Sequence, residues 1–500
     1  MRVLLVSANR EHLPDPIFPL GLAYIAAAVS KAGHEIDVAD LCFGRHPLDE
    51  LRAQVARFEP NVIGLSLRNV DNAAYPLTVD YLALHREVVD VLHAASNAPV
   101  VLGGSGFSIL PDAYMNELDG DWGIAGEGER AFVALLRALE YGIDPSTIAG
   151  VVPPAAKAKT SSSLPIQPQR PQNWGEELRP LRDPFDYARY IRRGGTGNIQ
   201  TKRGCVFKCS YCTYPLLEGN RFRARDAADV VDEIEELQQD YGPHPIFFVD
   251  SILNFPRGHV EAICEEILLR KLNLRWSCYA TPIKLDRHQA QLMAAAGCEG
   301  IELGTDAVDD EQLARLGKSF NAEIAERANR YCMEAGLKVC QTIIFGAPGE
   351  TRESVSATCR ALRNMNPTAV VAMTGVRLYP GTPLTISLIK EGKIHADDVG
   401  LLPTFYIEPA VSDFLPGFLQ QQAYGTGNWV LPGLVDPIQP VSQRLLRGLG
   451  IAGPLWRLFH KPWMQWFYRS NFKRPDTSWG VPNAAKKVVE IKGSVTNENH

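Results

Sequence analysis

The chain has 500 residues, of which 45% are hydrophobic and 22% charged, and its formal net charge is -6. This length predicts two or three domains, and the composition excludes a disordered chain. The negative charge argues against nucleic-acid binding. Only one of the ten cysteines precedes Cys205, so a secreted disulfide framework is not expected. No signal-peptide pattern and no membrane-length apolar run occur, which predicts a cytoplasmic protein.

Residues 1–145 alternate short apolar runs with helical patterns. The runs at 3–6, 35–39, 62–67, 100–102 and 122–125 are predicted strands. Helices are expected between them near 20–32, 48–58 and 79–95. This alternation predicts an α/β domain with a doubly wound, Rossmann-like parallel sheet, whose ligands bind beyond the carboxyl ends of the strands.

Two of these strands end in glycine-rich segments. The segments contain Gly103, Gly104 and Ser105 after one strand and Gly126, Glu127 and Gly128 after another. Glycine permits positive φ and a close approach of backbone amides to a ligand, although it is also an ordinary turn residue. Neither segment matches G-x-G-x-x-G, so NAD is not expected.

Residues 146–195 are predicted to be a linker. The stretch 152–171 mixes Pro, Ser, Ala and Gln without hydrophobic periodicity, which is typical of an irregular surface connection.

Cys205, Cys209 and Cys212 follow with the spacing C-x3-C-x2-C. Three thiolates on one loop can hold three irons of a [4Fe-4S] cluster and leave the fourth iron open to a small molecule. A structural zinc site is the alternative, but it normally needs a fourth Cys or His nearby, and none follows Cys212 closely.

This loop resembles that of the radical S-adenosylmethionine (SAM) enzymes. The resemblance implies that the open iron binds the amino and carboxylate groups of SAM. An electron, supplied by a donor such as flavodoxin or ferredoxin, then cleaves SAM to a 5'-deoxyadenosyl radical. Tyr211 matches the aromatic position that packs on the adenine.

Residues 196–385 repeat units of strand and helix, and about six strands are predicted, which indicates a partial (β/α)6 TIM barrel. By resemblance, Asp250 contacts the SAM amino group, Asp306 also touches SAM, and Gly346 lets the backbone approach the adenine. Asp306 is one methylene shorter than the usual Glu or Gln. Helix capping or plain turns are the alternatives. Buried apolar positions are expected for Cys264, Cys278, Cys298, Cys332, Cys340 and Cys359.

The order of domains adds a second resemblance. A doubly wound domain with these glycine-rich ends, placed before a radical SAM core, resembles the cobalamin-binding domain of B12-dependent radical SAM enzymes. The resemblance implies that the corrin tail lies against residues 103–105 and 126–128.

The histidine that often ligates cobalt is not expected here. No D-x-H-x-x-G motif is present, and His12 lacks the flanking Asp and Gly. Arg68 follows the third strand, where the corrin face should lie, and a guanidinium has no lone pair to give to cobalt. A strand-end salt bridge is the alternative for Arg68.

Residues 386–500 are predicted to form a mainly helical or irregular C-terminal segment that covers the barrel and shapes a substrate site, followed by a polar tail. The span 437–475 has no acidic residue and mixes arginines and lysines with aromatic residues. We favour a capping helix for this span, and peripheral contact with the inner face of a membrane is the alternative.

These features together predict a B12-dependent radical SAM enzyme that acts as a C-methyltransferase on a small-molecule or lipid substrate. The resemblance implies that SAM supplies the radical and, through cobalamin, the methyl group. Three alternatives stay open: a radical cyclase or rearrangement enzyme, a non-catalytic corrinoid-binding sensor, and a zinc-stabilised interaction protein. The residues do not identify the substrate.

Overall fold

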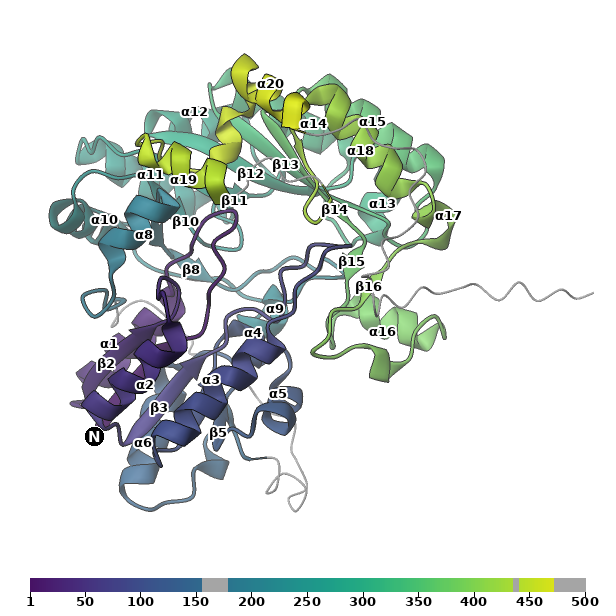
Figure 1. The fold of residues 1–500 in the computed structure, drawn as a ribbon. Helices are drawn as coiled ribbons and strands as arrows, with labels where there is room; N and C mark the ends of the chain where they lie inside the picture. Colours follow the sequence, from purple (N-terminus) through teal and green to yellow (C-terminus); the bar gives the residue numbers. More distant parts are fainter. Residues whose placement is uncertain (155–178, 435–439, 472–500) are drawn as a thin grey trace, which may run out of the picture.

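The computed structural model describes residues 1–154, 179–434 and 440–471, and the N-terminal unit in it is built on one sheet (Figure 1). Its strands are β1 (Arg2–Ser7), β2 (Glu35–Asp40), β3 (Val62–Ser66), β4 (Val100–Gly103), β5 (Trp122–Ile124) and β6 (Val151–Val152), in spatial order β2-β1-β3-β4-β5-β6. All neighbours are parallel except β5 and β6. The helices are α1 (Leu20–Lys31), α2 (Pro47–Phe58), α3 (Leu82–Ala95), α4 (Ser105–Ile109), α5 (Pro111–Leu118) and α6 (Gly128–Glu140).

The alternation of side chains along β1 explains why helices cover both faces of this sheet. Val3 and Leu5 pack in the core that contains α1 and α6. Leu4 and Val6 point the other way and pack in the core that contains α2 and α3. Because successive side chains of a strand face opposite sides, a continuous apolar run needs cover on both. The doubly wound α/β sheet predicted from the sequence is therefore confirmed.

The second unit is a partial barrel whose sheet contains seven parallel strands. They are β7 (Gly197–Ile199), β10 (Ile246–Phe248), β11 (Trp276–Ala280), β12 (Cys298–Asp306), β13 (Lys338–Phe345), β14 (Ala369–Thr374) and β17 (Trp429–Val430), in the order β17-β14-β13-β12-β11-β10-β7. The covering helices are α10 (Ala227–Tyr241), α11 (Arg257–Leu269), α12 (Arg287–Ala295), α14 (Ala322–Glu334), α15 (Arg352–Met365) and α18 (Leu415–Thr426). The six expected strands are present, and β17 was not predicted because two residues in a Pro- and Gly-rich stretch carry no periodicity.

Two short hairpins interrupt the barrel pattern. The polar run at 198–202 divides between β7 and β8 (Lys202–Arg203), and β8 pairs antiparallel with β9 (Arg223–Ala224). β15 (Val376–Arg377) likewise pairs antiparallel with β16 (Phe405–Tyr406). The β8–β9 hairpin frames the cysteine loop, so the loop is held at both ends.

The C-terminal part of the predicted linker, beyond the stretch 152–171 that was expected to be irregular, contains a packed helix. α8 (Tyr187–Gly194) buries Tyr187 and Tyr190, whose rings meet Phe18 edge to face at centroid distances of 4.8 and 5.5 Å. An eight-residue helix buried through aromatic contacts shows too little periodicity to be recognised from sequence. Most of the Pro- and Ser-rich stretch lies outside the described residues.

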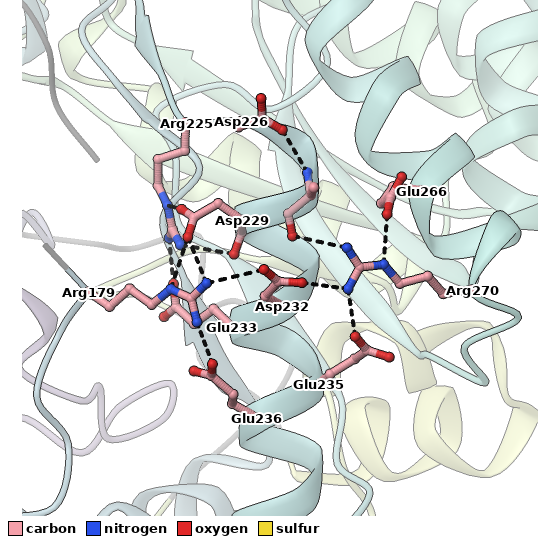
Figure 2. A network of polar contacts seen from close by, with 11 residues as sticks. Arg179, Arg225, Asp226, Asp229, Asp232, Glu233, Glu235, Glu236, Glu266 and Arg270 are labelled. Atoms are coloured by element: carbon pink, nitrogen blue, oxygen red, sulfur yellow. Dashed lines mark hydrogen bonds and ion pairs between the residues drawn. The ribbon is translucent and has the colours of Figure 1, made fainter. Parts of the chain in front are cut away.

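Carboxylates of the acidic helix α10 form ion pairs with arginines from separate segments (Figure 2). Arg179 donates to Asp229 at 2.9 Å, and Arg225, directly after β9, donates to the same carboxylate at 2.7 Å. Arg270, at the end of α11, pairs with Asp232 and Glu235. These pairs fasten the end of the cysteine hairpin to a barrel helix.

The C-terminal elements α19 (Pro440–Gly448), η3 (Leu455–His460) and α20 (Pro462–Asn471) lie over the barrel sheet, shown in yellow in Figure 1. Trp456 and Phe459 are buried in a core shared with Cys340 and Ala369 of the sheet. Trp463 and Trp466 are exposed. The buried rings support a capping role for η3, while residues 437–439 and 472–475 of the basic aromatic span lie outside the described part. In the described ranges, no helix is both long and apolar enough to cross a bilayer.

Ion pairs join the N-terminal domain to the rest of the chain. They are Arg203 with Glu127 and Glu129, Arg223 with Glu127, Arg377 with Asp71, and Arg447 with Asp15. Gln443 of α19 adds hydrogen bonds to the carbonyls of His12 and Pro14. The two units are thus held in one arrangement by charged contacts at several points.

Candidate active site

The three cysteines of the motif lie on one loop between β8 and α9 (Tyr214–Leu217). Cys205 is buried, and Cys209 and Cys212 are partly exposed. The Cys212 amide donates to the Cys209 carbonyl at 3.3 Å, and the Cys205 amide donates to the Gly219 carbonyl at 3.0 Å. Burial raises the pKa of each thiol, to about 12 for Cys212. Thiolates at this site therefore need a nearby positive charge, which bound iron provides.

Gly204 lets the loop turn tightly. Its φ is +93°, and a Cβ atom there would lie 2.0 Å from the Arg221 carbonyl oxygen. Only glycine combines this conformation with so close an approach. Gly204 therefore fixes the direction in which the chain enters the motif.

Asp250, predicted to contact SAM, bonds to the residues that lead into the cysteine loop. Its carboxylate is fully buried and accepts bonds from the Thr201 amide at 2.7 Å, the Lys202 amide at 3.2 Å and the Lys202 ammonium at 3.1 Å. The Thr201 hydroxyl also donates to it. With these partners both oxygens are occupied, so Asp250 positions the loop. The neighbouring Ser251, which the sequence did not single out, donates to the Gly204 carbonyl at 3.3 Å.

Tyr211 and Asp306 are brought together beside the motif. The Tyr211 hydroxyl donates to the Asp306 carboxylate, which also pairs with Lys318. Lys318 further donates to the Gly304 carbonyl at 3.1 Å, and it lies close to Cys209. Asp306 itself follows an irregularity in β12 and has a φ of +66°. This triad fixes the motif to the end of β12, and Lys318 carried no recognisable signal in the sequence.

Gly346, expected near the adenine, lies in the turn after β13. Its φ is +89°, and a Cβ there would meet Ile407 at 3.1 Å and the Gly375 amide at 3.4 Å. Its own amide donates to Glu350, whose pKa burial raises to about 8. Because Gly346 has no side chain, neighbouring parts of the protein can pack closely against this turn. The next helix is capped by Thr351 and not by Glu350.

The donor set suits a cluster better than a single ion. Within the ranges described, no three His, Cys, Asp or Glu side chains converge on one metal position. A zinc ion requires such convergence, whereas a cubane accepts each cysteine sulfur on a different iron. The chemistry of three thiols with no fourth ligand therefore fits a [4Fe-4S] cluster.

The glycine-rich end of β4 packs against the loop that follows β3. Gly104 has a φ of +98°, and a Cβ there would lie 2.7 Å from the Leu67 carbonyl oxygen. The Ser105 hydroxyl donates to the Arg68 carbonyl at 2.7 Å. Gly103, by contrast, has room for a side chain, with its nearest neighbour at 3.7 Å. The segment therefore packs against the loop after β3 that carries Arg68.

The carboxylate of Glu127, a residue expected beside the corrin, forms ion pairs within the protein. Its carboxylate is buried and accepts a bond from Arg223 at 2.8 Å and pairs with Arg203 at 3.2 Å. The flanking Gly126 has a φ of +87°, and a Cβ on Gly128 would lie 2.9 Å from the Ile25 side chain. Glu127 therefore links the N-terminal domain to the hairpin that carries the cysteines.

Arg68 faces the barrel from the carboxyl edge of the N-terminal sheet. Burial lowers the pKa of its guanidinium, and the nearby groups that oppose this include Tyr279 and Tyr214 of the barrel. Across the described chain no carboxylate forms an ion pair with Arg68, so the salt-bridge alternative is not observed there. His12 is engaged elsewhere, because its Nε2 lies 2.6 Å from the Cys42 carbonyl oxygen.

Family models match both halves of this arrangement. Residues 6–136 match the B12 binding domain, and residues 199–362 match the Radical SAM superfamily, which together is more than half of the chain. The chain belongs to the cobalamin-dependent radical SAM enzymes. The cofactors of this enzyme are a [4Fe-4S] cluster, SAM and cobalamin.

Individual relatives agree with the family. Tryptophan 2-C-methyltransferase of Streptomyces laurentii is 29% identical, over 78% of this chain and 74% of the relative. The radical SAM methyltransferase TsrM of Kitasatospora setae, solved with tryptophan and a SAM analogue, superposes with a TM-score of 0.79 at 26% identity, over 94% of this chain and 99% of that one. The anaerobic magnesium-protoporphyrin IX monomethyl ester cyclase of Rubrivivax gelatinosus is 24% identical, over 73% of this chain and 66% of the relative.

Proposed function

We propose that this radical SAM enzyme transfers a methyl group from SAM to a carbon atom of a small molecule. The observation that carries the proposal is the contact between the two domains at the cysteine loop. α9, directly after Cys212, touches α4, directly after Gly104. Arg203, two residues before Cys205, pairs with Glu127 and Glu129 of the N-terminal domain. A cluster and a corrin bound at these loops would lie on facing edges of the two sheets.

The roles of the protein residues follow from their contacts. When bound, the cofactors supply an electron for SAM cleavage and a carrier for the methyl group. Cys205, Cys209 and Cys212 hold the cluster, and Asp250 and Ser251 position their loop. The triad of Tyr211, Asp306 and Lys318 anchors the SAM side of the site. The external electron donor is of the flavodoxin or ferredoxin class.

The test is anaerobic turnover of reconstituted protein with SAM that carries a deuterated methyl group, with tryptophan as the first substrate and cell extract as the second. We expect mass spectrometry to find the labelled methyl on a substrate carbon, together with S-adenosylhomocysteine. A cyclase, the second candidate raised by the Rubrivivax relative, would release 5'-deoxyadenosine and leave the product unlabelled. A sensor would leave SAM intact.

We further propose that Arg68 would lie beside the corrin when cobalamin is bound, and that no histidine of the described chain would ligate its cobalt. The support is that Arg68, which is partly buried, forms no ion pair with a carboxylate among the described residues, and that His12 is already bonded to the Cys42 carbonyl. A guanidinium cannot donate an electron pair, so Arg68 would not serve as a ligand to cobalt. Residues 103–105 and the backbone of 126–128 would hold the rest of the corrin.

Arg68→His is expected to add a nitrogen ligand that the native chain lacks. Electron paramagnetic resonance of the protein loaded with cob(II)alamin should show nitrogen hyperfine splitting in Arg68→His only. Arg68→Lys keeps the positive charge without a histidine nitrogen and should resemble the native spectrum. Nitrogen splitting in the native protein would overturn this assignment.

A further inference from the structure

Glu302 is an acidic residue on the inner face of the barrel sheet. Its neighbours on β12, Ile301 and Leu303, are fully buried in the core that contains α11 and α12. Because side chains alternate along a strand, Glu302 points to the opposite side, into the barrel. There it meets the C-terminal cap, since the Trp456 indole N–H donates to Oε1 of Glu302 at 2.8 Å.

The charge of Glu302 has no partner among the described residues. Glu299, three positions earlier, pairs with both Arg275 and Arg457. Glu302 receives only the Trp456 bond, and burial raises its pKa to about 7. A carboxylate kept in a poorly solvated place without a cation costs stability, and such residues mark binding sites.

A second aromatic side chain, Tyr279, lies near Glu302 on the neighbouring strand. Tyr279 on β11 lies close enough that Glu302 is the main cause of its raised pKa. The Tyr279 ring is 40% exposed although it stands on the inner face of the sheet, and it contacts Phe247 of β10 edge to face at 5.0 Å. The space in front of Tyr279 is therefore not filled by side chains of the described residues.

The same tyrosine links Glu302 to the cobalamin domain. Tyr279 also lies close enough to Arg68 to oppose the lowering of the pKa of its guanidinium, and Arg68 lies at the carboxyl ends of the strands of the N-terminal sheet. Tyr279 thus lies near both Glu302, which contacts the C-terminal cap, and Arg68, at the edge where the corrin is proposed. A substrate held by Glu302 would have its other end directed toward the methyl carrier.

We propose that Glu302 binds a protonated amine of the substrate, with the Tyr279 and Trp456 rings beside it. A carboxylate forms a charge-assisted hydrogen bond with an ammonium group, and aromatic faces attract cations. This inference rests on the proposed methyl transfer and narrows its substrates to small molecules that carry a basic nitrogen. Lipids without an amine are not substrates.

The test compares the binding of tryptamine and tryptophol, which share the indole side chain but end in an amine and a hydroxyl. Isothermal titration calorimetry uses native protein loaded with cluster, cobalamin and SAM. We expect tryptamine to bind at least about tenfold more tightly, and Glu302→Gln to abolish this preference, because its amide keeps a hydrogen bond to Trp456 but loses the charge. Glu302→Asp should retain the preference.

Glu299→Gln, on the same strand, is the matched control and should keep the preference for the amine. Iron and cobalamin contents identify any variant that fails to fold, in which case Glu302→Asp and the native protein decide the result. An equal affinity for both ligands, no binding of tryptamine to native protein, or a preference that survives in Glu302→Gln would overturn the proposal. Labelled methyl transfer is measured separately. A failure of the amine preference can therefore be distinguished from a failure of methyl transfer.

Discussion

Cys212→Ala is expected to abolish the cluster and with it the chemistry. With two thiolates left on the loop, the cubane lacks one of its three protein ligands. We expect iron to fall from about four atoms per reconstituted chain to a small fraction of that. SAM cleavage should drop by at least about 10³-fold, because the residues of a catalytic unit act together. Iron and sulfide analysis and electron paramagnetic resonance of the reduced protein measure this.

Cys332→Ala is the matched control for this prediction. Cys332 is fully buried on α14 and belongs to the main apolar core. Its loss should lower stability by about 1 kcal/mol and leave the iron content unchanged. If both variants load equal amounts of iron, the motif is not the cluster site, and zinc in the native protein would support the structural alternative.

Arg377→Met is expected to lower the free energy of unfolding by about 3–5 kcal/mol, the typical effect of breaking a buried pair from one side. The Arg377 and Asp71 side chains are 5% and 0% exposed and lie 2.8 Å apart, so the remaining carboxylate would be buried without its cation. Arg377 also donates to the Leu378 and Thr404 carbonyls, which would lose a donor. Chemical denaturation followed by circular dichroism measures the change.

Two further variants distinguish the effect of breaking this buried pair from the general effect of losing an arginine. Arg86→Met removes an exposed pair with Glu117 and should cost less than about 1 kcal/mol. Adding Asp71→Asn to Arg377→Met should restore part of the stability, because the unpaired charge disappears. If Arg377→Met is as stable as Arg86→Met, the interdomain pair does not hold the domains together.

The main elements of both sheets were predictable because their signals are local. Val3 to Val6 are consecutive apolar residues, and a strand buried on both faces needs such a run. The expected burial of the remaining barrel cysteines, such as Cys264 and Cys359, is also confirmed. Short elements escaped prediction, as with β17 and α8, because two or eight residues give no period to detect.

The site was less predictable, because a strand end shows that a polar residue is present but not what it binds. Asp250 was expected to face SAM, yet it accepts bonds from Thr201 and Lys202. Glu127 was expected beside a corrin, yet it pairs with Arg223, 96 positions away. Glu302 stood unnoticed within a segment noted for Asp306, although the alternation of β12 places it on the inner face.

The sequence by itself determined the alternation of strands and helices in each domain and the spacing of Cys205, Cys209 and Cys212, because periodicity and loop ligands involve residues near one another in the chain. Only the tertiary structure decided which charges are satisfied within the protein and which remain open to a ligand. Asp71 finds its partner 306 positions away, while Arg68 beside it finds no carboxylate among the described residues. Ion pairing depends on distances of a few ångströms in space, and these are set by how the two domains pack.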